Sequence, residues 1–357
     1  MLRSWRVWAG FGITLLFLGL FLYNTDFRDI GNSFKNANYL LALASLPVYF
    51  VGIWVRTLRW QYLLRPVKKL SVWRLYPVVI IGLMANNVIP ARAGELVRAF
   101  VLGERENVSK ASSLGTIAVD RLFDGLTLVP LMLIIIPIAG NTEKFPLPVV
   151  DFTINLAQLA FIMAVLFGAA LAVLFVLAFS GRSRDWVDAM ILRLTPARFH
   201  DSIEGLAQSF FVGLNALRNP VDLTLAWLMS TVSWLIEGTM YYIVARAFGV
   251  DVGFEYILLI TAAANLAISV LASQGGIGPF ELVAKQTLIA ASVAQASAEA
   301  YAIALHALVL LPVTAIGLYL MGTMGLSLGE MFKRSTTSSR GAGDAPFAVR
   351  PEEVPGS

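Results

Sequence analysis

The sequence predicts an all-α fold, a polytopic membrane helical bundle with six full spans and two inverted re-entrant hairpins made of broken helices. Hydrophobic residues make up 57% of the 357 residues and charged residues only 14%. A soluble protein of this length would expose far more charge. Apolar runs of bilayer length recur along the chain. Two further apolar runs are interrupted by Pro, Gly and polar residues, and these interruptions predict the hairpins.

Six apolar runs are long enough to cross a bilayer, which takes about 20 residues of helix. They cover residues 5–23, 39–55, 111–138, 150–179, 221–248 and 300–324. The first run has Arg3 and Arg6 at its start, as a signal peptide would. No clean cleavage site of small residues follows it, so we interpret this run as a span.

The two broken segments cover residues 75–102 and 255–294. The first breaks at residues 86–95, NNVIPARAGE, and the second at residues 273–281, SQGGIGPFE. Pro90 lacks an N–H and Gly94 has a high entropy cost in a helix, so the first helix should stop and restart here. Two broken apolar segments in corresponding halves of a membrane protein indicate a transport site, with the two tips meeting.

The distribution of Lys and Arg decides whether each broken segment crosses the membrane or returns. If both return, 21 of the 27 Lys and Arg fall on the cytoplasmic side. If the first segment instead crosses once, the five arginines of residues 180–219 move outside. We therefore expect the first hairpin to enter from the cytoplasm, the second to enter from outside, and both termini to be cytoplasmic.

We expect one membrane domain, residues 1–332, followed by a disordered cytoplasmic tail, residues 333–357, that is rich in Ser, Gly and Pro. Within the domain, residues 181–219 are polar, and an apolar stripe at helical spacing runs from Ile203 to Leu217. Two interpretations stay open for this stretch: helices lying along the cytoplasmic interface, or a small cap packed on the spans.

Several side-chain chemistries are excluded by composition. The chain has no cysteine and only two histidines, His200 and His306, which are too few and too scattered for a His-based metal site. No metal and no cofactor are expected. His306 stands alone in an apolar span and is expected to be packed and hydrogen-bonded rather than a ligand.

Asp120, Arg121 and Asp124 lie near the centre of the third span. A charge at the centre of a spanning helix costs roughly 2.5–3.5 kcal/mol on insertion scales, so three charges need partners or water. Asp120 and Asp124 share a helix face, and Arg121 is three residues from Asp124. Two interpretations stay open: an ion-pair cluster that holds helices together, or a cavity lining that contacts a lipid headgroup.

Arg92, Glu95 and Arg98 flank the first break. Arg98 is one turn from Glu95, so a local ion pair is one interpretation. The other is a headgroup site, because guanidinium groups hold phosphate with two hydrogen bonds and helix N-termini favour anions. Asn86 and Asn87 are expected to satisfy backbone groups freed at the break, or to contact a ligand.

Glu237 and Glu281 are further carboxylates within apolar segments and are functional candidates for that reason. The alternative is that either one pairs with Arg121 or Arg92. At the second break, Gly275, Gly276 and Gly278 permit a tight turn and a close approach of the backbone. Arg56 and Arg59 end the second span and are expected to be ordinary interfacial anchors, with a functional role as the alternative.

Three spaced motifs occur in order: NxxPxxxGExxR from Asn87, DRxxD from Asp120 and GGIGxxE from Gly275. With these motifs, and with RxxRW from Arg56, the chain resembles the lysylphosphatidylglycerol synthase transmembrane-region family, also described as flippase-like membrane proteins. The similarity covers roughly residues 5–324. Many relatives have a glutamate where Asp120 stands, which leaves the charge intact.

The resemblance implies a prokaryotic inner-membrane protein associated with moving aminoacylated phospholipids or other lipid-linked headgroups between leaflets. The bifunctional synthases of the family carry a soluble aminoacyl-transferase domain after the membrane part. Here only residues 333–357 follow, which is too short for a catalytic domain. We therefore expect the flippase half alone, without synthesis of lysylphosphatidylglycerol by this chain.

Two functions from different classes stay open. The first is a lipid translocase that moves a phospholipid or lipid-linked headgroup between leaflets. The second is a membrane enzyme or accessory subunit that modifies a polyprenyl-linked or phospholipid headgroup, with Asp120, Asp124 or Glu95 as acid or base. The longest cytoplasmic stretch, residues 180–219, has no acidic metal pair such as Asp-x-Asp. This favours the translocase.

The expected partner is a membrane lipid with an anionic or zwitterionic headgroup. A second copy of the chain or a separate lipid-modifying enzyme is a further candidate, and nucleic acid is not expected. No residue of the translocase is expected to be catalytic. The residues predicted to bind the headgroup are Asn87, Arg92, Glu95, Arg98, Asp120, Arg121, Asp124, Glu237, Gly276, Gly278 and Glu281.

Overall fold

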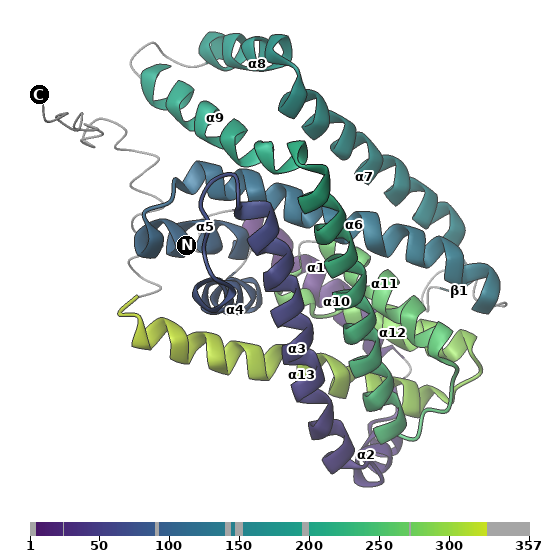
Figure 1. Cartoon of the computed structure of the whole chain (residues 1–357). Coiled ribbons are helices and arrows are strands. Elements are labelled where there is room, and N and C mark those ends of the chain that lie inside the picture. Colours follow the sequence, from purple (N-terminus) through teal and green to yellow (C-terminus); the bar gives the residue numbers. More distant parts are fainter. Residues whose placement is uncertain are drawn as a thin grey trace, which may run out of the picture.

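The computed structural model describes residues 5–23, 25–89, 93–139, 144–146, 153–194, 200–270 and 273–326 (Figure 1). Pro90, Arg92 and residues 333–357, which carried predictions above, lie outside the described residues. The described chain is almost entirely helical, as predicted. The exception is one antiparallel pair of three-residue strands, β1 (Lys144–Pro146) and β2 (Thr153–Asn155). β2 lies within residues 150–179, which were predicted as a span, and the helix there starts at Leu156.

In chain order the helices are α1 (Trp5–Leu22), α2 (Phe27–Lys35), α3 (Tyr39–Leu64), α4 (Val72–Val88), α5 (Gly94–Glu106), α6 (Lys110–Ala139), α7 (Leu156–Phe179), α8 (Gly181–Leu194), α9 (His200–Leu214), the 3-10 helix η2 (Asn215–Arg218), α10 (Pro220–Ala247), α11 (Phe254–Val270), the 3-10 helix η3 (Gln274–Gly276), α12 (Pro279–Ala290) and α13 (Gln295–Thr323).

Four of the described helices are long and apolar enough to cross a membrane: α3, α6, the Ala160–Phe179 part of α7, and α13. The apolar helices Gly12–Leu22, Val72–Val88 and Phe254–Val270 are shorter. Helix α10 has 28 residues, about 42 Å at 1.5 Å per residue, which is enough length for a span. Its polar residues, Glu237 among them, lower its mean hydropathy.

The chain contains two four-helix units of matching design. Helices α3 to α6 have 26, 17, 13 and 30 residues, and helices α10 to α13 have 28, 17, 12 and 29 residues. The first helix of each unit starts at an asparagine cap. Asn38 accepts the N–H of Leu41 at 3.0 Å, and Asn219 accepts the N–H of Val221 at 3.0 Å.

The second unit is inverted relative to the first, because α3 and α10 lie side by side in opposite directions (Figure 1). The N–H of Asn38, before α3, donates to the carbonyl of Ala247, at the end of α10, at 2.8 Å. At the other end, Arg65 pairs with Asp222 at 2.6 Å. Two further pairs of helices connect the units: α4 packs against α13, and α11 packs against α6.

The second and third helices of each unit fold back on each other at the predicted breaks. In the first unit the backbones of α4 and α5 approach so closely that a Cβ on Gly94 would lie 2.2 Å from the carbonyl oxygen of Gly82. Asn86 Oδ1 accepts the freed N–H of Gly94 at 2.8 Å, which is one of the two roles predicted for Asn86. The break therefore stops one helix and caps the next.

The turn of the second unit also forms where expected. Gly275, Gly276 and Gly278 have φ angles of +61°, +80° and +95°, which residues with a Cβ rarely adopt. The tips of the two hairpins are in contact, since Gln274 Nε2 donates to the carbonyl of Val88 at 3.1 Å. This contact was predicted from the two breaks.

Helices α7 to α9 connect the two units. Helix α9 packs along α6, where Ser112 Oγ donates to the carbonyl of Ser209 at 2.7 Å. Of the two interpretations of residues 181–219, the packing of α9 agrees with a cap on the spans. Helix α7 is different, because only 11% of its apolar 18-residue stretch is buried inside the bundle.

Candidate functional site

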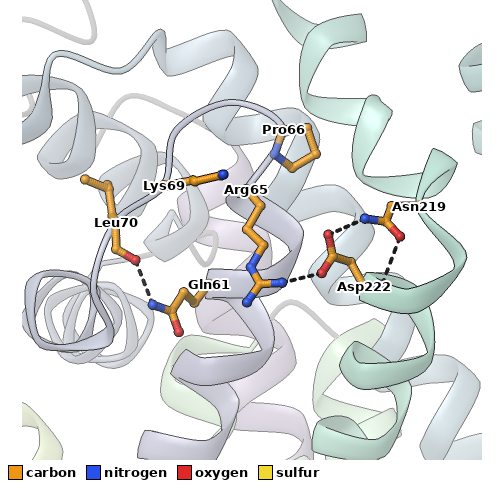
Figure 2. A pocket seen from close by; sticks show the side chains of 7 residues that line it. All are labelled: Gln61, Arg65, Pro66, Lys69, Leu70, Asn219 and Asp222. Carbon is orange, nitrogen blue, oxygen red and sulfur yellow. Dashed lines mark hydrogen bonds and ion pairs between the residues drawn. The ribbon is translucent and has the colours of Figure 1, made fainter.

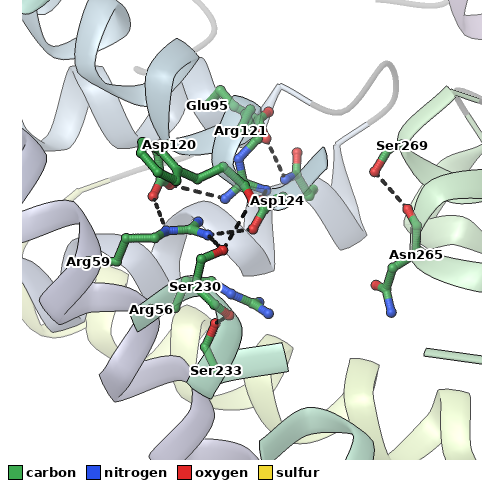
Figure 3. A network of polar contacts seen from close by, with 12 residues as sticks. Arg56, Arg59, Glu95, Asp120, Arg121, Asp124, Ser230, Ser233, Asn265 and Ser269 are labelled. Carbon is green, nitrogen blue, oxygen red and sulfur yellow. Dashed lines mark hydrogen bonds and ion pairs between the residues drawn. The ribbon is translucent and has the colours of Figure 1, made fainter. Parts of the chain in front are cut away.

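Four arginines and four carboxylates gather where α3, α5, α6 and α10 meet, and Figure 3 labels all of them except Arg98 and Glu237. We call them the arginine–carboxylate cluster; its members are Arg56, Arg59, Glu95, Arg98, Asp120, Arg121, Asp124 and Glu237. They come from both four-helix units. Sequence reasoning predicted six of the eight as headgroup residues, and missed Arg56 and Arg59.

Arg59 lies at the centre of the cluster and its side chain is fully buried. Its Nε donates to Asp120 Oδ1 at 2.8 Å, and its Nη1 donates to Asp124 Oδ1 at 2.7 Å. The same Nη1 donates to the hydroxyl of Ser230 on α10 at 2.8 Å. One guanidinium group therefore connects α3 with α6 and α10.

Asp120 is surrounded by arginines. Besides Arg59, it accepts from Arg98 Nη1 at 3.0 Å and from Arg121 Nη2 at 3.2 Å. Its side chain is fully buried. Three cations from three helices compensate the negative charge of this carboxylate, which would be very costly to bury alone. Arg98 therefore pairs with Asp120, and not with Glu95 as the local alternative had suggested.

The cluster is open on one side, at Arg121. The Arg121 side chain pairs with Asp124 at 3.1 Å and is still 36% exposed, whereas the Arg59 side chain is buried. Glu95 is half-buried beside it and accepts from Asn86 Nδ2 at 3.3 Å. Figure 3 shows Glu95 and Arg121 together at this side of the cluster.

Glu237 joins the cluster through α3. Its Oε2 pairs with Arg56 Nη2 at 2.7 Å, and its Oε1 accepts from the hydroxyl of Tyr241 at 3.1 Å and from Asn265 at 3.3 Å. The Arg56 guanidinium also stacks over the ring of Trp234, 4.6 Å from its centroid. The partner of Glu237 is therefore Arg56, and not Arg121 as one interpretation had it.

Arg56 and Arg59 are not interfacial anchors, and that prediction is wrong. It assumed that the second span ends near residue 55, but α3 continues to Leu64 and carries both arginines into the interior of the bundle. The ring of Trp60, which follows, packs under the guanidinium of Arg98 at 4.1 Å. The three residues thus lie on the buried face of α3.

Each arginine of the cluster keeps a buried N–H without a hydrogen-bond partner among the described residues. These groups are Nε of Arg56, Arg98 and Arg121, and Nη2 of Arg59. A buried donor without an acceptor costs about 1–3 kcal/mol, and more when it is charged. Four such donors in one place fit a site for an additional acceptor, such as a phosphate oxygen.

Three predicted residues, Asn87, Gly276 and Gly278, lie at the hairpin tips. Asn87 donates from Nδ2 to Thr314 Oγ1 at 3.0 Å and so connects α4 with α13. Gly276 lies in the turn after α11 and is buried. The backbone of Gly278 passes so close to α1 that a Cβ there would lie 2.8 Å from Phe17.

Glu281 bonds to a different set of groups. Its Oε1 lies 2.6 Å from His306 Nδ1, and its Oε2 accepts the N–H of Gly278 at 2.8 Å. The expectation that Glu281 shares one site with the arginines is therefore not what the structure shows. The first turn of α12 directs this carboxylate towards α13. His306 is packed and hydrogen-bonded, as predicted.

A surface pocket of about 570 Å³ lies away from the cluster, where α3 ends and α10 begins (Figure 2). Its lining is Gln61, Arg65, Pro66, Lys69, Leu70, Asn219 and Asp222. Arg65 and Asp222 pair across it at 2.6 Å. None of the predicted headgroup residues lines this pocket, so we place the candidate site at the cluster.

These features define a multi-pass helical membrane protein with a buried ion cluster between two inverted units. The family described as lysylphosphatidylglycerol synthase TM region matches residues 7–317, and the chain belongs to this family. The resemblance noted in the motifs is thereby confirmed. The chain is a membrane-embedded protein of a prokaryotic family.

Curated relatives come from archaea. The chain is 27% identical to "Glycosyltransferase AglD" of Haloferax volcanii over 327 residues, 85% of this chain and 52% of that relative. It therefore spans about half the length of that protein. It is 25% identical over 292 residues to a "UPF0104 membrane protein" of Methanothermobacter thermautotrophicus, 75% of this chain and 78% of the relative. A second such protein from the same organism is 24% identical over 258 residues, 70% and 75% of the two chains.

Proposed function

We propose that this protein is a lipid translocase that moves a phospholipid or lipid-linked headgroup between the leaflets of a prokaryotic cytoplasmic membrane. The observation that carries the proposal is the arginine–carboxylate cluster, in which each of the four arginines keeps one buried N–H donor without an acceptor among the described residues. A phosphodiester supplies acceptor oxygens in the planar geometry that guanidinium groups match. The headgroup enters on the side of Arg121, whose side chain is 36% exposed.

The zwitterionic character of many headgroups fits the same opening. Glu95 stands beside Arg121 and is half-buried, so it presents a carboxylate to a cationic amine near the phosphate. The net charge of the cluster is zero, with four arginines facing four carboxylates. A phosphate can therefore replace a carboxylate as the partner of one arginine, and the displaced carboxylate can pair with the amine of the headgroup. The net buried charge then stays the same.

The inverted units support the topology that alternating access requires. We infer six full spans, with α4–α5 and α11–α12 as re-entrant hairpins that enter from the cytoplasm and from outside, and both termini in the cytoplasm. Contact between the two tips, through Gln274 and Val88, supports this arrangement. Irregular backbone at membrane depth is tolerated where it lines a watery cavity, as the tips do in inverted-repeat transporters.

A second candidate function is a membrane enzyme, or a subunit of one, that acts on lipid-linked glycans. It is favoured by the name of the AglD relative, a glycosyltransferase. The match covers 52% of that protein, so the name alone does not assign transferase chemistry to the matched half. The same comparison adds lipid-linked glycans to phospholipids as substrate classes for the translocase. A second copy of the chain or a separate lipid-modifying enzyme remains the proposed protein partner.

Reconstitution tests the translocase directly. Purified protein in phosphatidylcholine vesicles, with tail-labelled fluorescent phosphatidylglycerol or phosphatidylethanolamine as the probe, should make the inner-leaflet probe accessible to dithionite. Arg121→Gln and Glu95→Gln should slow this exchange, because they remove the charges at the opening while keeping size and polarity. Arg28→Gln changes an exposed arginine on α2 and is the matched control.

Two results separate the candidates. Exchange at the protein-free rate contradicts the translocase function. Equal exchange in the parent and both charge variants contradicts the proposed site. Mass spectrometry of the recovered lipids after incubation with nucleotide sugars distinguishes the enzyme. A translocase returns the probe chemically unchanged, whereas a transferase adds the mass of a sugar.

A further inference from the structure

A second buried ionisable pair lies outside the arginine–carboxylate cluster, in the second unit. Glu281 stands in the first turn of α12 and His306 lies on α13, with side chains that are 10% and 4% exposed. His306 Nδ1 is 2.6 Å from Glu281 Oε1, and His306 Nε2 is 3.1 Å from the carbonyl oxygen of Gly275. The ring of Phe280 stacks on the imidazole at 4.4 Å and fixes its plane.

The hydrogen-bond geometry determines how many protons this pair holds. A carbonyl oxygen only accepts, so Nε2 of His306 carries the hydrogen that it donates to Gly275. An ionised carboxylate also only accepts, so the 2.6 Å contact between Nδ1 and Glu281 needs a proton between the two atoms. The pair is either an imidazolium beside a carboxylate or a neutral imidazole beside a carboxylic acid. Both forms hold one proton more than a neutral histidine beside an ionised glutamate.

The charged and titratable groups around the pair are paired with one another. Lys285 on α12 pairs with Glu299 on α13 at 2.5 Å, and Glu237 on α10 pairs with Arg56. The hydroxyls of Tyr241 and Tyr301 donate to Glu237 and to the carbonyl of Tyr241. Arg74 and Glu255 stand in the first turns of α4 and α11, at the ends of these helices away from the turn of residues 273–278. Residues 14–22 of α1 contain no charge. The proton therefore belongs to the His306–Glu281 pair.

The two units place different chemistry at corresponding positions. Glu95 and Glu281 stand in the first turns of α5 and α12, and Arg121 and His306 are each the twelfth residue of the long helix that follows. Arginine stays charged at any physiological pH, whereas histidine changes charge between about pH 5 and 8. The first unit thus presents a fixed cation where the second presents a removable proton.

Loss of the proton would act on the turn between α11 and α12. A deprotonated Nδ1 and a carboxylate oxygen are both acceptors and repel each other at 2.6 Å. Glu281 also accepts the N–H of Gly278, and His306 donates to Gly275, so the pair holds both ends of this turn. Gln274 in the same turn bonds to Val88 at the tip of the first hairpin.

We propose that the His306–Glu281 pair binds the proton that couples lipid translocation to a proton gradient. With the proton bound, the turn of residues 273–278 is closed against the tip of α4; when the proton leaves, the turn detaches and the two tips separate. The coupling part rests on the proposed translocase function. The effect of the proton on the turn does not depend on it.

The first experiment measures the turn and needs no lipid substrate. The chain has no cysteine, so Ser273→Cys places a single thiol in the turn, where the serine is fully buried. Ser269→Cys on α11 is exposed and serves as the reference for thiol ionisation. We expect the maleimide labelling rate at 273, divided by the rate at 269, to rise by about tenfold from about pH 5.5 to 8.5.

Two carboxylate variants make this experiment specific. Glu281→Gln supplies an N–H to Nδ1 and an oxygen to Gly278, so it mimics the protonated state and should keep the ratio low at every pH. Glu299→Gln changes another buried carboxylate, outside the pair, and should keep the pH dependence. A parent ratio that does not change with pH, or a Glu281→Gln variant that still responds, overturns the proposal.

The second experiment measures coupling. In phosphatidylcholine vesicles with fluorescent phosphatidylglycerol as the probe, a gradient of about two pH units should change the exchange rate of the parent by about tenfold and leave Glu281→Gln unaffected. Exchange that ignores the gradient in the parent refutes coupling and leaves the translocase standing. If the parent does not move the probe at all, the proposed function and the coupling both fail for phospholipids, and the cysteine ratio decides the proton site alone.

Discussion

The ion pair between Arg56 and Glu237 offers a clean test of how the cluster joins the two units. Arg56 Nη2 and Glu237 Oε2 are 2.7 Å apart, and the two side chains are 10% and 7% exposed. The residues are 181 positions apart in the sequence, and each is the eighteenth residue of the first helix of its unit. The pair therefore lies where corresponding positions of α3 and α10 face each other.

Removing one partner of a buried pair leaves an uncompensated charge and typically costs about 3–5 kcal/mol. We expect this loss for Arg56→Met and for Glu237→Met separately, so simple additivity gives roughly 6–10 kcal/mol for the double variant. In the double variant no charge is left unpaired. The hydrogen bonds from Tyr241 and Asn265 to Glu237 are lost, at about 1 kcal/mol each. The stacking of Arg56 on Trp234 is also lost, and the apolar burial of the two methionines offsets it. The double variant should therefore lose no more than about 2 kcal/mol.

Thermal unfolding in detergent, followed by tryptophan fluorescence, measures these differences. Trp234 stacks on Arg56 and reports locally. At about 2 °C per kcal/mol, each single variant should melt roughly 6–10 °C below the parent and the double variant within about 4 °C of it. The charge-swapped variant, Arg56→Glu with Glu237→Arg, should recover most of the stability. Additive losses, or single variants that melt like the parent, would refute the pairing.

Two further predictions test the topology and the first hairpin. Single cysteines that replace Ser109, before α6, and Ser202, in α9, should resist an impermeant thiol reagent in intact cells and react once the membrane is opened; labelling of either from outside contradicts the re-entrant arrangement. Gly94→Ala should lower the melting temperature or the folded yield, because its Cβ would lie 2.2 Å from the carbonyl oxygen of Gly82, and overpacking typically costs 1–3 kcal/mol. Gly168→Ala, where nothing lies within 4 Å, is the control and should behave like the parent.

The parts of the fold that local chemistry determines could be predicted from the sequence. The breaks at Pro90 with Gly94, and at the glycines from Gly275 to Gly278, were predicted from backbone chemistry that acts within a few residues. The breaks therefore appear where predicted, and the capping role of Asn86 follows from the N–H groups that a restarting helix leaves free. Contact between the two tips followed from the paired interruption in the two halves.

The pairing of charges could not be predicted in the same way, because it depends on how distant helices pack. Arg56 and Arg59 were assigned to the membrane interface because the apolar run ends near residue 55. The structure shows that α3 continues through these polar residues to Leu64 and that both arginines lie inside the bundle. A signal was present: Arg56, Arg59 and Trp60 lie on one helical face, as a buried stripe does. The contact between Glu281 and His306 required the position of α13 relative to α12.

The exposure of α7 has a consequence for how the chain is counted across the bilayer. In the proposed topology each four-helix unit makes two crossings and one return, so it begins and ends on the same side. Two such units joined by a loop would point the same way. A single additional crossing changes the parity and turns the second unit over, and α7 is that crossing. Only 11% of its apolar stretch is buried. This fits a segment that needs to be hydrophobic and to cross the bilayer, but does not need a particular packing surface. Its sequence can therefore drift while an odd number of crossings is preserved.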